Sequence, residues 1–131
     1  LDAIKNSIIH QIRRGKHSLL TSLVSTDDEI NYHTIFQAIE MRDPLCIDAL
    51  EEAAYYYGLA IANTILMLQP DIVVCGGTLI PKYTFFDTVK KTIETKLALF
   101  PNIKTEVYPA SHAYEIVSQG AGAMVLEHLV N

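Results

Sequence analysis

The chain has 131 residues, half of them hydrophobic, and carries a formal net charge of −5. This length suits one domain or one lobe of a larger one, and the hydrophobic content excludes a chain that is disordered by composition. The acidic balance lacks the positive field that non-specific phosphate binding needs, so these residues by themselves are not expected to bind nucleic acid.

The first third of the chain is predicted to be helical. Isoleucines recur at helical spacing along the first segment, and Asp2 is its expected N-cap. Arg13, Arg14 and Lys16 surround Gly15, which is typical of a helix end that complements the helix dipole. The pattern predicts helices over Leu1–Arg14, within Lys16–Val24 and over Tyr32–Met41.

The longest helix is predicted over Pro44–Gln69. Asp43 is its expected N-cap and Pro44 its first residue, where a missing N–H does no harm. The second half, "GLAIANTILML", is apolar on almost all sides and should be buried on most of them. Gly58 lies in the helix interior at a cost of about 1 kcal/mol relative to Ala. We therefore expect another backbone to approach closely there.

A short apolar strand is predicted over Asp71–Cys75. Its uniform β-branched composition is typical of a central parallel strand that is covered on both faces. Lys104–Tyr108 alternates in character and is expected to form a half-exposed edge strand. Together with the helices, these strands predict an α/β fold.

Two more helices complete the pattern. Thr84 and Asp87 form a capping-box-like pair that opens a helix ending at Leu99. Ser118 introduces a last helix that begins with the small residues "GAGA". "SHAYE" (Ser111–Glu115) is interpreted as a loop near the ligand cleft.

Gly76 and Gly77 follow the first strand directly, with Thr78 beside them. Ligands in open α/β sheets bind beyond the carboxyl ends of the strands. Glycine permits positive φ and lets a flat or anionic group approach the backbone closely. Taken alone, the pair is equally compatible with a turn that merely needs unusual dihedral angles.

The histidines, Cys75 and a tyrosine triplet are weaker candidates for functional sites. The five histidines do not show metal-ligand spacing, so no metal site is expected. The histidines are His10, His17, His33, His112 and His128. Cys75 lies among valines and is interpreted as a small hydrophobic residue rather than a nucleophile.

Tyr55, Tyr56 and Tyr57 cover about 300° of a helix and cannot all be core. One or two of these rings are expected to face a partner lobe or a second subunit, with solvent exposure of one ring as the alternative.

The two cysteines and the length of the longest apolar stretch indicate where in the cell the protein is located. Cys46 and Cys75 form no CxxC motif, which suits a reducing compartment. The longest apolar stretch, Gly58–Leu68, is shorter than the roughly 20 residues that span a bilayer. A cytoplasmic protein without a membrane partner is expected.

Two stretches resemble the C-terminal part of the ROK family (repressors, open reading frames and sugar kinases). They are "DPLCIDALEEAAYYYGLAIANTILMLQPDIVVCGGTLI" (Asp43–Ile80) and "SQGAGAMVLEHLV" (Ser118–Val130), and "FFDTVKKTI" (Phe85–Ile93) fits the intervening helix. The resemblance implies the C-terminal lobe of an actin-like (ribonuclease H-like) ATPase fold, with helices packed on a small sheet, over residues 1–131. It also implies that Gly76, Gly77 and Thr78 face a nucleotide, if one binds. The sugar-binding residues are unknown.

Parts that the family uses for catalysis are not found in these residues. The DxGxT phosphate hairpin, the catalytic aspartate and the Cys-rich zinc motif do not occur. We therefore expect a fragment with no catalytic residue, metal or cofactor of its own, whose N-terminal lobe and any DNA-binding domain lie outside it. A parent kinase would need ATP and Mg²⁺.

The stretch before the last helix helps to choose between family functions. "HAYEIVSQGA" (His112–Ala121) lacks the "DxAGxxGA" pattern that the resemblance implies for kinases. This favours the effector and dimerisation lobe of a sugar-responsive repressor, with a sugar or sugar phosphate as effector, a homodimer as assembly, and DNA contact only through an N-terminal domain. The alternative is the C-terminal lobe of an ATP-dependent, glucokinase-like sugar kinase. A third hypothesis, compatible with both, is a dimer-interface module with an apolar patch around the long helix.

Overall fold

A computed structural model describes residues 1–111 of the chain. It divides the chain into two compact units, Leu1–Tyr56 and Tyr57–Asn131, and each is treated by itself. One helix, α4 (Pro44–Leu68), contributes its first half to one unit and its second half to the other. The predicted last helix, all of "SHAYE" after Ser111, and the stretch that bears on the kinase pattern lie outside the described residues. No helix of the described part is long and apolar enough to cross a membrane.

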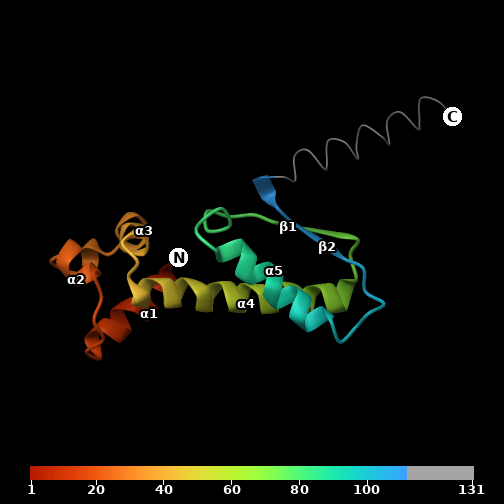
Figure 1. The fold of residues 1–131 in the computed structure, drawn as a ribbon, viewed down its shortest axis with the longest axis horizontal. Helices are drawn as coiled ribbons and strands as arrows, with labels where there is room; N and C mark the ends of the chain where they lie inside the picture. Colours follow the sequence, from red (N-terminus) through yellow and green to blue (C-terminus); the bar gives the residue numbers. More distant parts are fainter. Residues whose placement is uncertain (112–131) are drawn as a thin grey trace, which may run out of the picture. The chain divides into compact units, whose positions relative to one another are not determined.

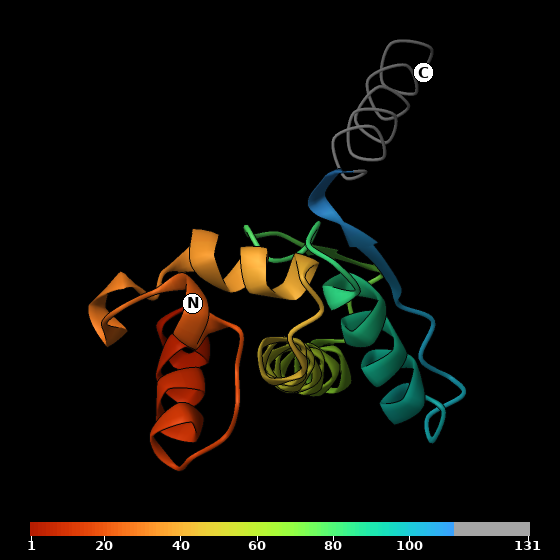
Figure 2. The ribbon, with the colours of Figure 1, turned by 60° about the vertical axis from the view of Figure 1, so that its left-hand side comes forward.

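All regular secondary structure in the first unit is helical (Figure 2). Its core is formed mainly by aliphatic side chains, among them Ile8, Leu20, Ile35 and Leu50, each at most 1% exposed. The elements are α1 (Asp2–Arg13), α2 (Leu20–Leu23), the 3-10 helix η1 (Asp27–Glu29), α3 (Tyr32–Glu40) and the first half of α4.

The end of α1 confirms the interpretation of its basic residues as a helix stop. Gly15 has φ +90°. Its N–H donates to the Ile12 carbonyl at 2.9 Å, and the Lys16 N–H donates to the Gln11 carbonyl at 3.1 Å. This is the hydrogen-bond pattern of a Schellman motif, in which glycine relieves the cost of positive φ. Arg13 also pairs with Asp27 at 2.6 Å on the surface.

Two predicted side-chain caps do not form. Asp2 lies within the first turn of α1, and Leu1 is the N-cap without a side-chain hydrogen bond. Thr84 is at the N-cap position of α5 (Phe85–Leu97) as expected, but its backbone is not extended and its side chain makes no cap hydrogen bond, so the predicted capping box does not form. A capping box occurs instead at α3, where the side chain of Asn31 accepts from Thr34 and the side chain of Thr34 accepts from Asn31.

Asp43 caps α4 as expected. Its carboxylate accepts the Cys46 N–H at 3.1 Å, and the same group accepts the Ser18 hydroxyl at 2.8 Å and the Leu19 N–H at 2.9 Å. Asp43 is 1% exposed. The cap therefore also ties the segment before α2 to the start of α4.

The second unit contains a small parallel sheet beside two helices (Figure 1). Strand β1 (Ile72–Cys75) pairs with β2 (Glu106–Pro109), so that Ile72 lies opposite Glu106 and Cys75 opposite Pro109. The second half of α4 and α5 complete the unit. The α/β prediction is confirmed at this level: the described chain is rich in helix and carries a two-stranded parallel sheet.

Gly58 marks the contact between α4 and α5. A Cβ at this position would lie 2.8 Å from the Thr92 Cβ and 2.9 Å from the Val89 carbonyl oxygen. The expectation of a close backbone approach is confirmed.

Burial of the second unit is less complete than predicted. Cys75 is 1% exposed, but Ile72 and Val74, which alternate to the other side of β1, are 46% and 43% exposed. Met67 and Leu68 at the end of α4 are exposed as well. The prediction that this strand is covered on both faces is therefore wrong for the described residues, because covering both faces of a parallel sheet requires a layer on each side.

Candidate functional site

The candidate site is the bend that follows β1. Gly76, Gly77 and Thr78 are all exposed. Gly77 has φ +126°, a conformation that side chains rarely adopt, and no atom of the described residues lies within 4 Å of the position that a Cβ would occupy there. A Cβ on Gly76 would only reach ordinary contact with the Ala110 Cβ at 3.9 Å. The bend therefore presents bare, open backbone.

Strand pairing places this bend at the carboxyl end of the sheet. Because β1 and β2 are parallel and Cys75 lies opposite Pro109, both strands end at the same edge. The residues that follow them, Gly76 and Ala110, are neighbours for this reason. Binding sites of open α/β sheets form at this edge.

Tyr57 of α4 contacts the backbone of the bend. Its hydroxyl donates to the Gly76 carbonyl at 3.4 Å, and its ring centroid lies 5.9 Å from that of Phe85. Burial raises the pKa of the Tyr57 phenol, and nearby Cys75 raises it further, so the hydroxyl stays a neutral donor. Sequence reasoning treated Tyr57 only as part of a tyrosine triplet. The feature of the sequence that could have singled out Tyr57 is its position directly before Gly58, on the side of α4 that meets α5.

Two buried residues hold the loop between the bend and α5. Ile80 is 6% and Phe85 4% exposed. The Lys82 N–H donates to the Leu79 carbonyl at 2.9 Å, and the Phe85 N–H donates to the Lys82 carbonyl at 3.0 Å. The glycine bend is thus exposed to solvent, while buried residues hold the chain before and after it.

The described groups at this bend are bare backbone, the Thr78 hydroxyl and the Cys75 thiol. Cys75 is buried, and burial raises the pKa of its thiol, so the interpretation of Cys75 as a small hydrophobic residue is confirmed. Within residues 1–111, no three His, Cys, Asp or Glu side chains gather as a metal-binding group. Bare backbone beside a hydroxyl suits a flat or anionic group. The assignment of Gly76, Gly77 and Thr78 to a nucleotide stays a prediction.

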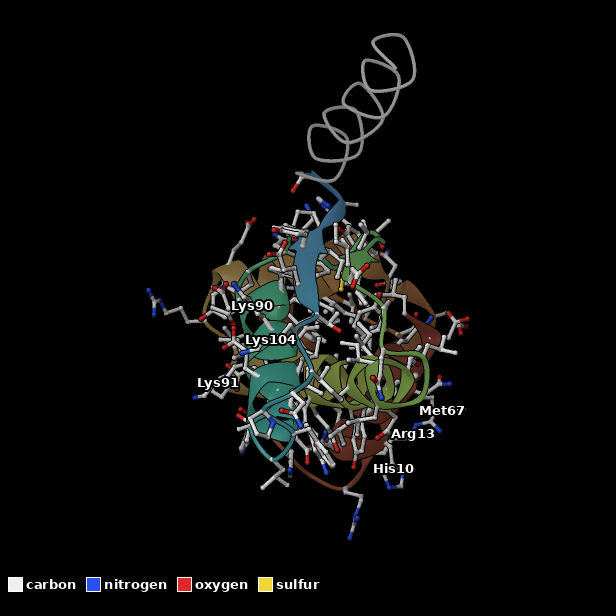
Figure 3. All side chains as sticks on the ribbon, turned by 90° about the vertical axis from the view of Figure 1, so that its right-hand side faces the viewer. His10, Arg13, Met67, Lys90, Lys91 and Lys104 are labelled. Carbon is white, nitrogen blue, oxygen red and sulfur yellow. The ribbon has the colours of Figure 1, made fainter. Side chains whose placement is uncertain are left out.

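A separate groove lies between α5 and β2. Its volume is about 460 Å³, and none of the three bend residues lines it. Figure 3 shows Lys90 of α5 and Lys104, which precedes β2, on this part of the unit. Aliphatic side chains and three charged groups share the lining, including Ile93, Leu97, Val107, Lys90, Glu94 and Glu106.

The remaining candidates are dispersed. His10, His17 and His33 are exposed, whereas His112 and His128 lie outside the described residues. Tyr55, Tyr56 and Tyr57 are 47%, 61% and 37% exposed, so no member of the triplet is core among the described residues. Cys46 and Cys75 are both free and buried.

Comparison with known proteins gives one family. A family model described as "ROK family" matches residues 9–128. The xylose repressor of Bacillus spizizenii is 18% identical over 124 residues, which cover 92% of this chain and 32% of that protein. The xylose repressor of Bacillus subtilis is 17% identical over 122 residues, with the same two shares. The chain thus spans about a third of the length of these curated relatives. No solved structure matches the chain.

Proposed function

The chain belongs to the ROK family, and we propose that it is the effector and dimerisation lobe of a sugar-responsive transcriptional repressor. The observation that carries this proposal is the similarity to two xylose repressors along 92% of the chain. The lobe is not catalytic by itself. Its partner is the remainder of the same protein, which would complete an actin-like fold in the cytoplasm.

The geometry of the second unit supports a binding role. The bend at Gly76 and Gly77 is open, and it lies at the edge of the sheet where ligands of α/β proteins bind. A sugar or sugar phosphate is the proposed effector of the whole protein. DNA would be bound by a separate N-terminal domain, because a formal net charge of −5 on this chain does not favour phosphate.

Ligand-dependent stability of the full-length protein tests the proposal. A ligand that binds only the native state stabilises it by about 2.7 kcal/mol at 100 times its Kd. We expect xylose or another sugar of a small panel to raise Tm and to weaken binding of the protein to DNA from its own promoter region. ATP with Mg²⁺ should leave both unchanged. Stabilisation by ATP with Mg²⁺, together with sugar-dependent release of ADP, would contradict the repressor function.

A sugar kinase is the second candidate, and one observation favours it. The strand and the Gly76–Thr78 bend keep the open backbone that a nucleoside needs for close approach. ATP and Mg²⁺ would then be cofactors of the whole protein. Gly77→Val in the full-length protein should abolish stabilisation by ATP, because the added side chain occupies the open space through which a nucleoside would approach. The variant also carries backbone strain at φ +126°, so its Tm without ligand is the reference for its Tm with ATP. Equal stabilisation of the variant and the natural protein would contradict a nucleotide at this bend.

A further inference from the structure

The peptide between Gly76 and Gly77 is free to rotate on steric grounds. Neither residue carries a Cβ, so both orientations of this peptide plane are accessible at little cost. Local packing does not choose between them. A Cβ on Gly76 would make only ordinary contact with Ala110, and a Cβ on Gly77 would meet no described atom within 4 Å. A contact from outside the bend is therefore needed to hold the peptide in one orientation.

The hydroxyl of Tyr57 makes this contact. It donates to the Gly76 carbonyl at 3.4 Å, and the Gly76–Gly77 peptide makes no other hydrogen bond within residues 1–111. The Tyr57 ring is held in turn, because its centroid lies 5.9 Å from that of Phe85 at the start of α5. One side chain of α4 thus contacts both the bend and the end of the loop that follows it.

The direction of the Gly76 carbonyl determines the direction of the next N–H. In a planar trans peptide the C=O of one residue and the N–H of the following residue point in opposite directions, and no described peptide bond is cis. Because the Gly76 carbonyl points toward Tyr57, the Gly77 N–H points away from it. This N–H donates to no acceptor among residues 1–111. It is therefore a free donor at the carboxyl edge of the sheet.

We propose that Tyr57 is a positioning residue, whose hydroxyl orients the Gly76–Gly77 peptide so that the Gly77 N–H faces the bound effector. Tyr57 contacts the backbone of the bend, and the N–H contacts the ligand. The group that accepts this N–H is an oxygen atom, either of a sugar hydroxyl or of a phosphate ester. The inference rests on the proposed function, because it assigns one contact to the effector of the repressor.

Tyr57→Phe in the full-length protein tests the inference, because it removes the hydroxyl and keeps the ring beside Phe85. Tyr83→Phe is the matched control, since Tyr83 is exposed and its hydroxyl makes no hydrogen bond within residues 1–111. Both variants should keep Tm within about 2 °C of the natural protein when no ligand is present. We expect only Tyr57→Phe to bind its effector more weakly, by about three- to tenfold.

Xylose and xylose 5-phosphate are the two probes, and calorimetric titration measures their dissociation constants. Weaker binding of xylose by Tyr57→Phe assigns a hydroxyl as the acceptor, whereas weaker binding of xylose 5-phosphate alone assigns the phosphate. Equal affinity of Tyr57→Phe and the natural protein for both probes overturns the inference. An equal loss of affinity in Tyr83→Phe also overturns it, because the effect would then not depend on the contact with Gly76.

Crystal structures of the full-length natural protein and of Tyr57→Phe, both without a probe, show the peptide directly. A rotated Gly76–Gly77 peptide in the variant, or one present in both orientations, supports the inference. The natural orientation in the variant overturns it. If neither probe binds the natural protein, the proposed function fails, and the peptide orientation alone then decides whether Tyr57 positions the bend.

Discussion

At the scale of single residues, Asp43 connects the segment before α2 to the start of α4 in the first unit. Its carboxylate is 1% exposed and accepts hydrogen bonds from Ser18, Leu19 and Cys46. Burial by itself raises the pKa of this group, but the hydrogen bonds of Cys46, Leu19 and Ser18 outweigh it, and the pKa lies below its ordinary value of 3.8. One side chain thus caps α4 and fixes the segment that leads into α2.

We expect Asp43→Ala to lower the free energy of unfolding at pH 7 by about 1 to 3 kcal/mol, because it removes a cap and leaves buried donors without their acceptor. The folded-state pKa is depressed, so the contribution of the ionised group is present above the unfolded-state pKa near 3.8 and is lost as pH falls through the lower folded-state pKa. Denaturant unfolding at pH 7 and in steps below pH 4 should show the difference from the natural protein shrinking with acid.

Asp48→Ala is the matched control for this prediction. Asp48 is exposed on the same helix, and a surface substitution there should change stability by less than about 0.5 kcal/mol. Equal effects of the two substitutions at pH 7 would contradict the role of Asp43.

At the scale of elements, the contact of α4 with α5 depends on the absence of a side chain. Gly58 lets the Thr92 Cβ and the Val89 carbonyl approach to distances that a Cβ cannot tolerate. Val89 and Ile93 of α5 are at most 1% exposed at this contact. The cost of glycine in a helix is offset here by close packing between the facing sides of α4 and α5.

Gly58→Ala should therefore reverse the usual effect of helix propensity. In an open helix the substitution stabilises by about 1 kcal/mol. Here we expect a loss of about 1 to 3 kcal/mol, because the backbone of α5 must shift to accept the methyl group. Thermal and denaturant unfolding measure the change.

Two further variants sharpen this prediction. Ala60→Gly, at an exposed position of the same helix, should lower stability by about 1 kcal/mol through propensity alone. Combining Gly58→Ala with Thr92→Ala should restore only part of the loss, since the Val89 carbonyl and the Cβ at position 92 remain. A stabilised Gly58→Ala variant would show that the two helices separate readily.

At the scale of the whole molecule, the exposed tyrosines bear on the proposed homodimer. Tyr55 and Tyr56 are 47% and 61% exposed, and their rings lie 5.5 Å apart in an edge-on arrangement. Large aromatic side chains of this kind are enriched at protein interfaces. Their place on the longest helix makes this surface the proposed contact between copies.

Replacing both tyrosines by serine should weaken dimerisation of the full-length protein at least tenfold, because two aromatic anchors are lost. Sedimentation over a range of concentrations measures the dissociation constant. Tyr83→Ser is the control, since Tyr83 is 53% exposed but lies outside α4. An unchanged dissociation constant in the double variant would exclude this surface from the interface.

Much of the local structure was predictable because its causes are local. The long helix with Asp43 as N-cap, the end of α1 at Gly15, and the two strands follow from caps, glycine and the spacing of apolar residues. The side-chain caps predicted at Asp2 and Thr84 do not form, because the type of a residue only suggests that it caps a helix. Its backbone must also take an extended conformation, which the neighbouring segment decides.

The sequence by itself determined the family, the order of helices and strands, and the glycine bend after β1, since each rests on a contiguous pattern. Only the tertiary structure decided that β1 and β2 pair in parallel, that Tyr57 reaches the Gly76 carbonyl, and that one side of β1 is uncovered in the described chain. The first two of these features join residues 34 and 19 positions apart. Such contacts depend on how helices and strands pack, and no short stretch of sequence contains the information that sets them.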